Sequence, residues 1–375
     1  MLLSKYIVEG TCSEIVHNWE PNCLNAYRSL IRDSAIGGLK MLLPLLCINY
    51  GLRIWRKNKS NDTLAKDLLI DGLRCIGIGP CLTITTVFYS CTIRYFLNRY
   101  TIITLTCIPA ILSGYTSAWI LGSKMTTQIL VPFNNAALES IVNVMAASGR
   151  LKLNRYNETI FFMFTNACLM YASKLSGPSY TSYTWFFKPD KKRRDEKIYL
   201  ESIFKKTRYY FGLGIGYGIV RMLIRDTSVL KLKNMHKLFN KQTLKPGIFA
   251  GSYVVLYEMI VYAMNRYFQK DRPAYALPAG FLAGLSYAID PNLAINISAF
   301  INLIQILYYL ADTQLLRPSL MESIIFGLCY GTMIHINFFY PENTAKIGSR
   351  MVELCSNGRF KFVATLLRKN VIYTV

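Results

Sequence analysis

Polar side chains interrupt several long apolar stretches of the chain, and these are the residues that could do chemistry. Asn135, Glu139 and Asn143 are four residues apart, so they share one face of a helix. Glu258 lies near the middle of a different apolar stretch. An ionised side chain at the centre of a bilayer costs about 2.5–3.5 kcal/mol on insertion scales, so such residues normally face the protein interior and pair with one another.

A second set of polar residues follows the same pattern. Ser298, Asn302 and Gln305 lie on one helix face, while Lys40 and Arg221 lie within two further apolar stretches. Two interpretations stay open: a polar path or ligand site between two halves of the chain, or a structural network that only holds helices together. The residues of the candidate path are Asn135, Glu139, Asn143, Glu258 and Asn302.

Three soft ligands lie close together near the N-terminus, at Cys12, His17 and Cys23. Thiolates and imidazoles are the ligands that zinc prefers, so these residues could begin a metal site. No fourth ligand is evident and the spacing matches no known zinc finger. A disulfide or a packing segment at the membrane interface is the favoured interpretation, and we predict no cofactor.

Glycines four residues apart occur repeatedly in the second half of the chain. In a membrane helix this spacing lets the backbone of another helix approach closely. We therefore expect tight helix packing within the chain, with a dimer face or a translocation seam as the alternative. The pairs are Gly214/Gly218, Gly247/Gly251, Gly280/Gly284 and Gly327/Gly331.

The composition points to a membrane protein. Of the 375 residues, 52% are hydrophobic and only 17% are charged, against roughly 25% charged in a typical soluble domain. The three histidines and the lack of any hydrolase, metalloprotease or phosphate-loop motif argue against an enzyme. The net charge of +22 lies mainly in connectors between apolar stretches, which favours anionic lipid headgroups over nucleic acid as the partner.

The apolar stretches predict an all-α, polytopic transmembrane helical bundle, because lipid offers no partner for an exposed backbone amide. About ten spans are expected. They cover residues 34–54, 68–93, 101–122, 124–147, 158–175, 207–225, 246–264, 274–289, 293–311 and 320–338.

An internal repeat would relate two groups of five spans. Arg94-Tyr95-Phe96 recurs as Arg266-Tyr267-Phe268, and the same offset brings the first four spans onto the sixth to ninth. An odd number of spans per half predicts that the halves are inverted in the membrane relative to each other. The alternative is coincidence in a chain with regularly spaced helices.

The predicted organisation has five parts. A basic cluster at 188–197 lies between the halves; a solvated linker is the favoured interpretation, with organelle targeting or anionic-lipid contact as the alternative. The parts are a Cys-containing segment at 1–33, the first half at 34–177, a basic linker at 178–206, the second half at 207–340 and a basic tail at 341–375.

Three blocks of sequence carry a family resemblance. They are Cys12 to Cys23 with His17, Trp19 and Pro21; Lys245-Pro-Gly-Ile-Phe-Ala-Gly-Ser-Tyr253 through Ala279-Gly-Phe-Leu-Ala-Gly284; and Leu316-Arg-Pro-Ser319. In this order they resemble the transmembrane protein 135 family. The glycine-rich second half is also distantly similar to the inner-membrane protein-translocase channel family. The chain looks shorter than typical family members, mostly in the central loop.

The resemblance implies a multi-pass protein of mitochondrial and peroxisomal membranes. It further implies a role in the balance of mitochondrial fission and fusion and in peroxisomal lipid metabolism. Membrane lipids and the fission machinery are the implied partners, and a homo-oligomer is an option. The chain would act either as a scaffold or as a secondary transporter or channel for a lipid-like solute.

Overall fold

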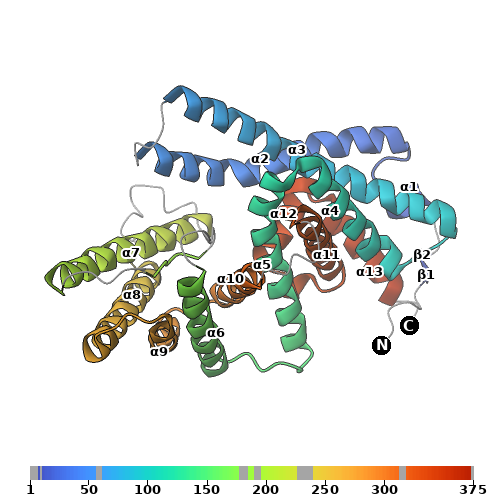
Figure 1. The fold of residues 1–375 in the computed structure, drawn as a ribbon. Helices are drawn as coiled ribbons and strands as arrows, with labels where there is room; N and C mark the ends of the chain where they lie inside the picture. The colour runs from blue at the N-terminus through green and yellow to red at the C-terminus, as the bar shows by residue number, and fades with distance from the viewer. Residues whose placement is uncertain are drawn as a thin grey trace. The chain divides into compact units, whose positions relative to one another are not determined.

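The computed structural model describes residues 7–8, 11–55, 61–176, 185–189, 196–225, 240–311 and 318–372. Within these ranges the protein is almost entirely helical, with thirteen α-helices and a few short 3-10 and π-helical segments (Figure 1). The one strand pair among the described residues joins β1 (Ile7–Val8) to β2 (Tyr100–Thr101) in antiparallel register. The predicted all-α class is therefore confirmed.

The chain divides into two compact units. Unit 1 comprises residues 1–151 and 314–375, and unit 2 comprises residues 152–313. This division differs from that of the predicted halves. The fifth predicted span, 158–175, belongs to unit 2, whereas the tenth, 320–338, belongs to unit 1 together with the first four.

Unit 1 is organised around α11, which packs lengthwise against α4 and α5. Phe133 and Phe326 face each other in its core, with ring centroids 4.9 Å apart. Its helices are α1 (Cys12–Ile15), α2 (Cys23–Trp55), α3 (Asn61–Leu97), the π-helix η2 (Ile103–Cys107), α4 (Ile108–Leu121), α5 (Ser123–Ala147), α11 (Pro318–Phe339), the 3-10 helix η7 (Pro341–Asn343), α12 (Lys346–Ser356) and α13 (Arg359–Ile372).

Unit 2 is built on the long packed pair α7 and α8, with α6 and α9 completing the core (Figure 1). Buried aromatic rings fill it, and Phe162 stacks on Tyr287 with centroids 4.7 Å apart. The helices are α6 (Arg155–Leu175), α7 (Glu196–Arg225), α8 (Lys241–Phe268), the 3-10 helix η5 (Pro273–Tyr275), α9 (Ala276–Ala283), the 3-10 helix η6 (Gly284–Ala288) and α10 (Leu293–Leu310).

The segment 185–189, inside the predicted linker, belongs to the core of unit 2. Phe187 is buried against Tyr253 and Tyr257, with ring centroids 5.5 and 5.2 Å away. The α7 helix then begins at Glu196 and buries Tyr199 and Ile203. These parts of the 178–206 range therefore contribute to folding as well as to connection.

Four helical stretches among the described residues are long and apolar enough to cross a membrane: Ile76–Leu97, Ile103–Leu121, Lys241–Phe268 and Leu293–Leu310. The other predicted ranges also fall on helices, with 274–289 divided among η5, α9 and η6. Among the described residues, the helices in those other ranges do not reach the combined length and apolarity of the four stretches. The number of ten spans is thus not confirmed.

Candidate functional site

Glu258 is the predicted site residue with the most complete set of partners. It lies on α8 and is almost fully buried. Both carboxylate oxygens are engaged by α7: the Tyr199 hydroxyl donates to Oε2 at 2.6 Å, and Lys206 Nζ lies 2.5 Å from Oε1. An ion pair with a phenol donor compensates much of the desolvation of a buried carboxylate.

A second polar link crosses unit 2 at Asn166, on the buried face of α6. Its amide nitrogen donates to the Gly280 carbonyl of α9 at 2.6 Å, and its oxygen accepts a bond of 2.6 Å from the Tyr253 hydroxyl of α8. Asn166 was missing from the sequence-based candidates because it has no amide or acidic neighbour one turn away. The available signal was that Asn166 is the one amide side chain in the mainly apolar stretch from Ile160 to Tyr171.

Two further residues extend this polar interior. Tyr257 lies one turn after Tyr253 on α8 and is buried, and its hydroxyl oxygen has no hydrogen-bond partner among the described residues. At the other end of α6, the Tyr287 hydroxyl donates to Glu158 Oε2 at 2.9 Å. Unit 2 therefore holds its helices with separate polar links embedded in aromatic packing.

Asn302, the fifth candidate for the polar path, is buried on α10. Its amide nitrogen donates to the Ser298 carbonyl one turn earlier at 2.6 Å. A side chain that bonds its own helix in this way satisfies a donor locally.

The remaining candidates lie on α5 in unit 1. Asn135, Glu139 and Asn143 are all half-buried. The neighbouring Ser140 hydroxyl accepts a bond of 2.9 Å from the Ala345 amide, directly before α12. This contact docks α12 on α5. The five candidates are thus divided, three in unit 1 and two in unit 2.

Lys40 and Arg221 complete the predicted polar set. Lys40 is exposed on α2. The side chain of Arg221 lies outside the described residues.

Hydroxyl groups, which the sequence analysis did not single out, link the helices of unit 1. Thr85 of α3 bonds Ser113 of α4 at 2.6 Å, and Thr106 of η2 bonds His335 Nδ1 of α11 at 2.8 Å. Small hydroxyl residues can satisfy themselves on their own helix, so their spacing carries little signal.

The paired glycines lie at close helix contacts. A Cβ atom built on Gly214 would lie 2.7 Å from Gly247 Cα, and one on Gly218 would lie 3.1 Å from Thr243 Cα, so α7 and α8 meet backbone to backbone. Gly251 is the loosest case, with Phe211 at an ordinary 3.4 Å.

The other two pairs are equally close to a neighbouring helix. A Cβ on Gly280 or Gly284 would lie 2.9 Å from Asn166 O or 2.7 Å from Met163 Cα, both on α6. In unit 1, Gly327 and Gly331 of α11 face the α4 side, where the Ile111 and Cys107 carbonyl oxygens lie 2.7 and 3.0 Å from the built Cβ positions.

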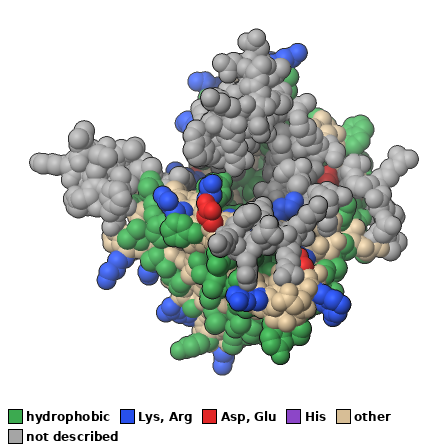
Figure 2. Space-filling model, turned by 60° about the vertical axis from the view of Figure 1, so that its left-hand side comes forward, with side chains coloured by type: hydrophobic (Ala, Val, Ile, Leu, Met, Phe, Trp, Pro, Cys, Tyr) green, Lys and Arg blue, Asp and Glu red, His purple; other side chains and the backbone are tan. Residues whose placement is uncertain are grey.

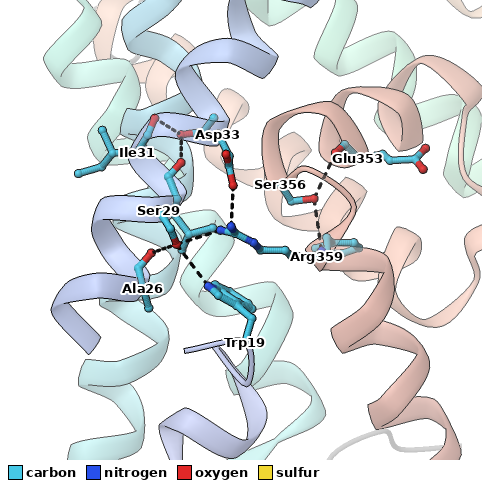
Figure 3. A network of polar contacts seen from close by, with 11 residues as sticks. Trp19, Ala26, Ser29, Ile31, Asp33, Glu353, Ser356 and Arg359 are labelled. Atoms are coloured by element: carbon cyan, nitrogen blue, oxygen red, sulfur yellow. Dashed lines mark hydrogen bonds and ion pairs between the residues drawn. The ribbon is translucent and has the colours of Figure 1, made fainter. Parts of the chain in front are cut away.

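The N-terminal segment is held by a polar cluster around Arg359, the first residue of α13 (Figure 3). Its guanidinium is 2.7 Å from Asp33 Oδ2 and 3.0 Å from Ser29 Oγ, and its Cζ lies 5.0 Å from the centroid of the Trp19 ring. Trp19 Nε1 donates to Ser29 Oγ at 3.4 Å. This Arg359 cluster fastens the two ends of unit 1 together.

His17 is buried beside this cluster, and its ring is hydrogen-bonded at both nitrogens. Nδ1 lies 2.8 Å from the Glu20 carbonyl and Nε2 lies 3.3 Å from Cys23 Sγ. Cys23 is an exposed free thiol, and the side chain of Cys12 lies outside the described residues. Within the described part of the chain, no three His, Cys, Asp or Glu side chains gather in a way that could hold a metal ion.

The chain was also compared with known proteins. No protein-family model matches it, and no solved structure matches it.

Proposed function

We propose that this chain is a multi-pass membrane protein of mitochondrial and peroxisomal membranes that acts on the fission/fusion balance and on lipid metabolism, and that it works as a membrane scaffold. The organelle and the process come from the resemblance to the transmembrane protein 135 family. The membrane location is supported by four helices of sufficient length and apolarity.

The observation that carries the membrane assignment is the outward placement of large apolar side chains on these four stretches. Each has at least one such exposed side chain, namely Phe88, Trp119, Met259 and Ile304. Extended apolar surface of this kind marks a membrane or protein contact. In Figure 2, hydrophobic side chains make up a large share of the described surface in the lower part of the view, with Lys and Arg side chains among and around them.

The scaffold interpretation is supported by how the buried polar groups are used. Both oxygens of Glu258 are bonded to α7, and Asn166 is bonded to α8 and α9. The hydrogen bonds and the ion pair of these two side chains all run between helices of unit 2. A solute would have to displace Lys206 or Tyr199 to reach the Glu258 carboxylate.

A transporter for a lipid-like solute is the second candidate. It is favoured by the short α9 helix, which is flanked by 3-10 segments at η5 and η6, because interrupted helices line binding sites in many secondary transporters. The inverted repeat of ten spans belongs to this proposal. Its local support is that Arg-Tyr-Phe lies at the C-terminal end of a membrane-length helix in both units.

A paired set of variants separates the two functions. Deletion of 178–206 would remove buried Phe187 and Tyr199, so the basic residues 191–194 are better replaced by Ala. The scaffold predicts altered mitochondrial networks in cells for this variant and unaltered networks for Glu258→Gln combined with Lys206→Met. The transporter predicts the reverse.

Reconstitution gives the direct test. If purified protein in liposomes moves no phospholipid, fatty acyl or sterol species, the transporter proposal fails. Carbonate extraction of membranes tests the shared premise, because an integral protein stays in the pellet.

A further inference from the structure

Two membrane-length helices end in the same sequence, Arg-Tyr-Phe, and in both its two aromatic residues are exposed. The α8 helix ends in Arg266-Tyr267-Phe268, where Tyr267 is 82% exposed. The α3 helix ends with Arg94-Tyr95-Phe96 followed by Leu97, and Tyr95 is 78% exposed. In both cases the next residue is a non-glycine with a positive φ, 52° at Gln269 and 51° at Asn98, which stops the helix sharply.

Three basic side chains surround the end of α8, and one of them, Arg266, donates from Nη1 to the Tyr262 hydroxyl at 3.4 Å. Arg266, Lys270 and Arg272 are exposed. The one acidic residue of this stretch, Asp271, is already paired with Lys174 at 2.8 Å. The surface formed by Arg266, Tyr267, Phe268, Lys270 and Arg272, the α8 corner, therefore carries three positive charges beside two exposed aromatic rings.

The position of the α8 corner along its helix fits a bilayer. Lys245 is exposed near the opposite end of α8. With a rise of 1.5 Å per residue, the 22 steps from Lys245 to Tyr267 span about 33 Å, close to the thickness of the hydrocarbon core. Tyrosine at such an end sits at headgroup level, and long basic side chains there reach toward the phosphates.

We propose that the α8 corner binds the anionic phospholipid headgroups of the membrane in which α8 lies, and that the end of α3 is a weaker second copy. The aromatic rings sit at the level of the glycerol and carbonyl groups, and the basic groups contact phosphate. The proposal rests on the membrane location proposed above.

The end of α3 is weaker for two reasons. Arg94 is half-buried with its Cζ 5.8 Å from the centroid of the Tyr100 ring, which leaves Arg99 as the exposed cation. Glu14 is close by: hydrogen bonds from Thr11 and, to a smaller extent, the charge of Arg94 keep the pKa of Glu14 below its usual value, so its carboxylate offsets one positive charge.

The test uses the full chain purified in a mild detergent and titrated with dioleoylphosphatidylglycerol or dioleoylphosphatidylcholine, with the shift in Tm as readout. We expect the phosphatidylglycerol shift to saturate at a lower lipid concentration. Arg266→Gln with Arg272→Gln should raise the half-saturating concentration about 25-fold, or roughly fivefold per charge. Arg94→Gln with Arg99→Gln should raise it by at most about fivefold.

Matched variants guard against a change in folding. Arg266→Lys with Arg272→Lys keeps the charge and should retain phosphatidylglycerol binding, and Arg150→Gln with Lys152→Gln removes two exposed charges elsewhere and should leave it unchanged. Equal shifts with both lipids, or full retention in the Arg266/Arg272 glutamine variant, would overturn the proposal.

Carbonate extraction separates this failure from failure of the proposed function. If the wild-type protein stays in the membrane pellet but shows no preference for phosphatidylglycerol, only the proposal of lipid binding at the α8 corner is refuted. If the wild-type protein is extracted, the proposed membrane location is refuted, and lipid binding at the α8 corner with it.

Discussion

Each unit contains an ion pair that joins distant parts of the chain, and the two pairs differ in how much water they meet. In unit 2, the side chains of Lys206 and Glu258 are 21% and 2% exposed. In unit 1, those of Arg359 and Asp33 are 24% and 15% exposed. The carboxylate of unit 2 depends on its partners for solvation, whereas that of unit 1 has access to water.

The redundancy of the contacts also differs. Arg359 has Asp33, Ser29 and the Trp19 ring as neighbours (Figure 3), so the loss of one contact leaves others. Glu258 has Tyr199 and Lys206, of which only Lys206 carries a compensating charge. We infer that the Lys206–Glu258 pair of unit 2 fixes helices in an apolar interior, while the Arg359–Asp33 pair of unit 1 fastens chain segments near the surface.

The substitution Lys206→Met is expected to have the largest effect on stability, and it tests the difference between the two ion pairs directly. This variant leaves the buried Glu258 carboxylate without a counter-charge. Removing one partner of a buried ion pair costs about 3–5 kcal/mol. The free energy of unfolding in detergent, from denaturant titration, should fall by that amount. The double variant Glu258→Gln/Lys206→Met should recover most of it, and a single variant as stable as the wild type would contradict the role assigned to this pair.

A smaller loss is expected from Gly214→Ala in the same unit. The added Cβ would meet the backbone of Gly247 at 2.7 Å, and forced repacking of this kind costs about 1–3 kcal/mol. Gly216→Ala is the matched control on the same helix, because nothing lies within 4 Å of its Cβ position. Its stability should equal or slightly exceed that of the wild type, because alanine favours a helix. Equal thermal stability of the two variants would show that α7 and α8 can separate without cost.

Arg359→Met should cost less than Lys206→Met, about 1–2 kcal/mol, because partial exposure screens the Asp33 interaction and water can replace the lost hydrogen bonds. Arg350→Met, an exposed residue of α12, is the control and should change stability by less than about 0.5 kcal/mol. Limited proteolysis provides a second readout, because cleavage near Trp19 should accelerate only in the Arg359 variant. A loss as large as that of Lys206→Met would remove the distinction between the units.

Much of the fold follows from the sequence because apolar stretches and their interruptions are local properties. Every predicted span falls on helical structure, and the range 101–122 nearly coincides with Ile103–Leu121. It was harder to predict which helices pack together, because α11 packs against α4 through contacts between residues more than two hundred positions apart in sequence. No periodicity in the sequence indicates which two helices will be neighbours.

For the polar residues too, the sequence indicates which side chain needs a partner but not which residue that partner is. Glu258 stands out in sequence because a lone carboxylate in an apolar helix needs a partner. Its partners Tyr199 and Lys206 fell in a range predicted to be a linker, where tyrosine and lysine are ordinary. The partners of Asn166, and the Thr85–Ser113 pair, became visible only once the facing helix was known.

The smallest expected effect on stability concerns the thiols of unit 1, and it distinguishes a half-buried cysteine from an exposed one. Burial raises the pKa of the Cys355 thiol on α12 to about 11, while Cys23 is exposed. A raised pKa favours the protonated thiol, so at pH 8 only about 0.1% of Cys355 is thiolate, the form that reacts. Brief treatment with N-ethylmaleimide should label Cys23 and spare Cys355, as read by peptide mass spectrometry, with no change in Tm. Raising the pH to 9 should increase Cys355 labelling about tenfold, because the thiolate fraction grows tenfold per pH unit well below the pKa. The α12 helix packs closely on α2, where a Cβ built on Gly37 would lie 2.7 Å from Cys355 Cα. Rapid labelling at pH 8 would mean that α12 separates readily from α2, and that the chain ends in unit 1 are fastened less firmly than the Arg359 cluster implies.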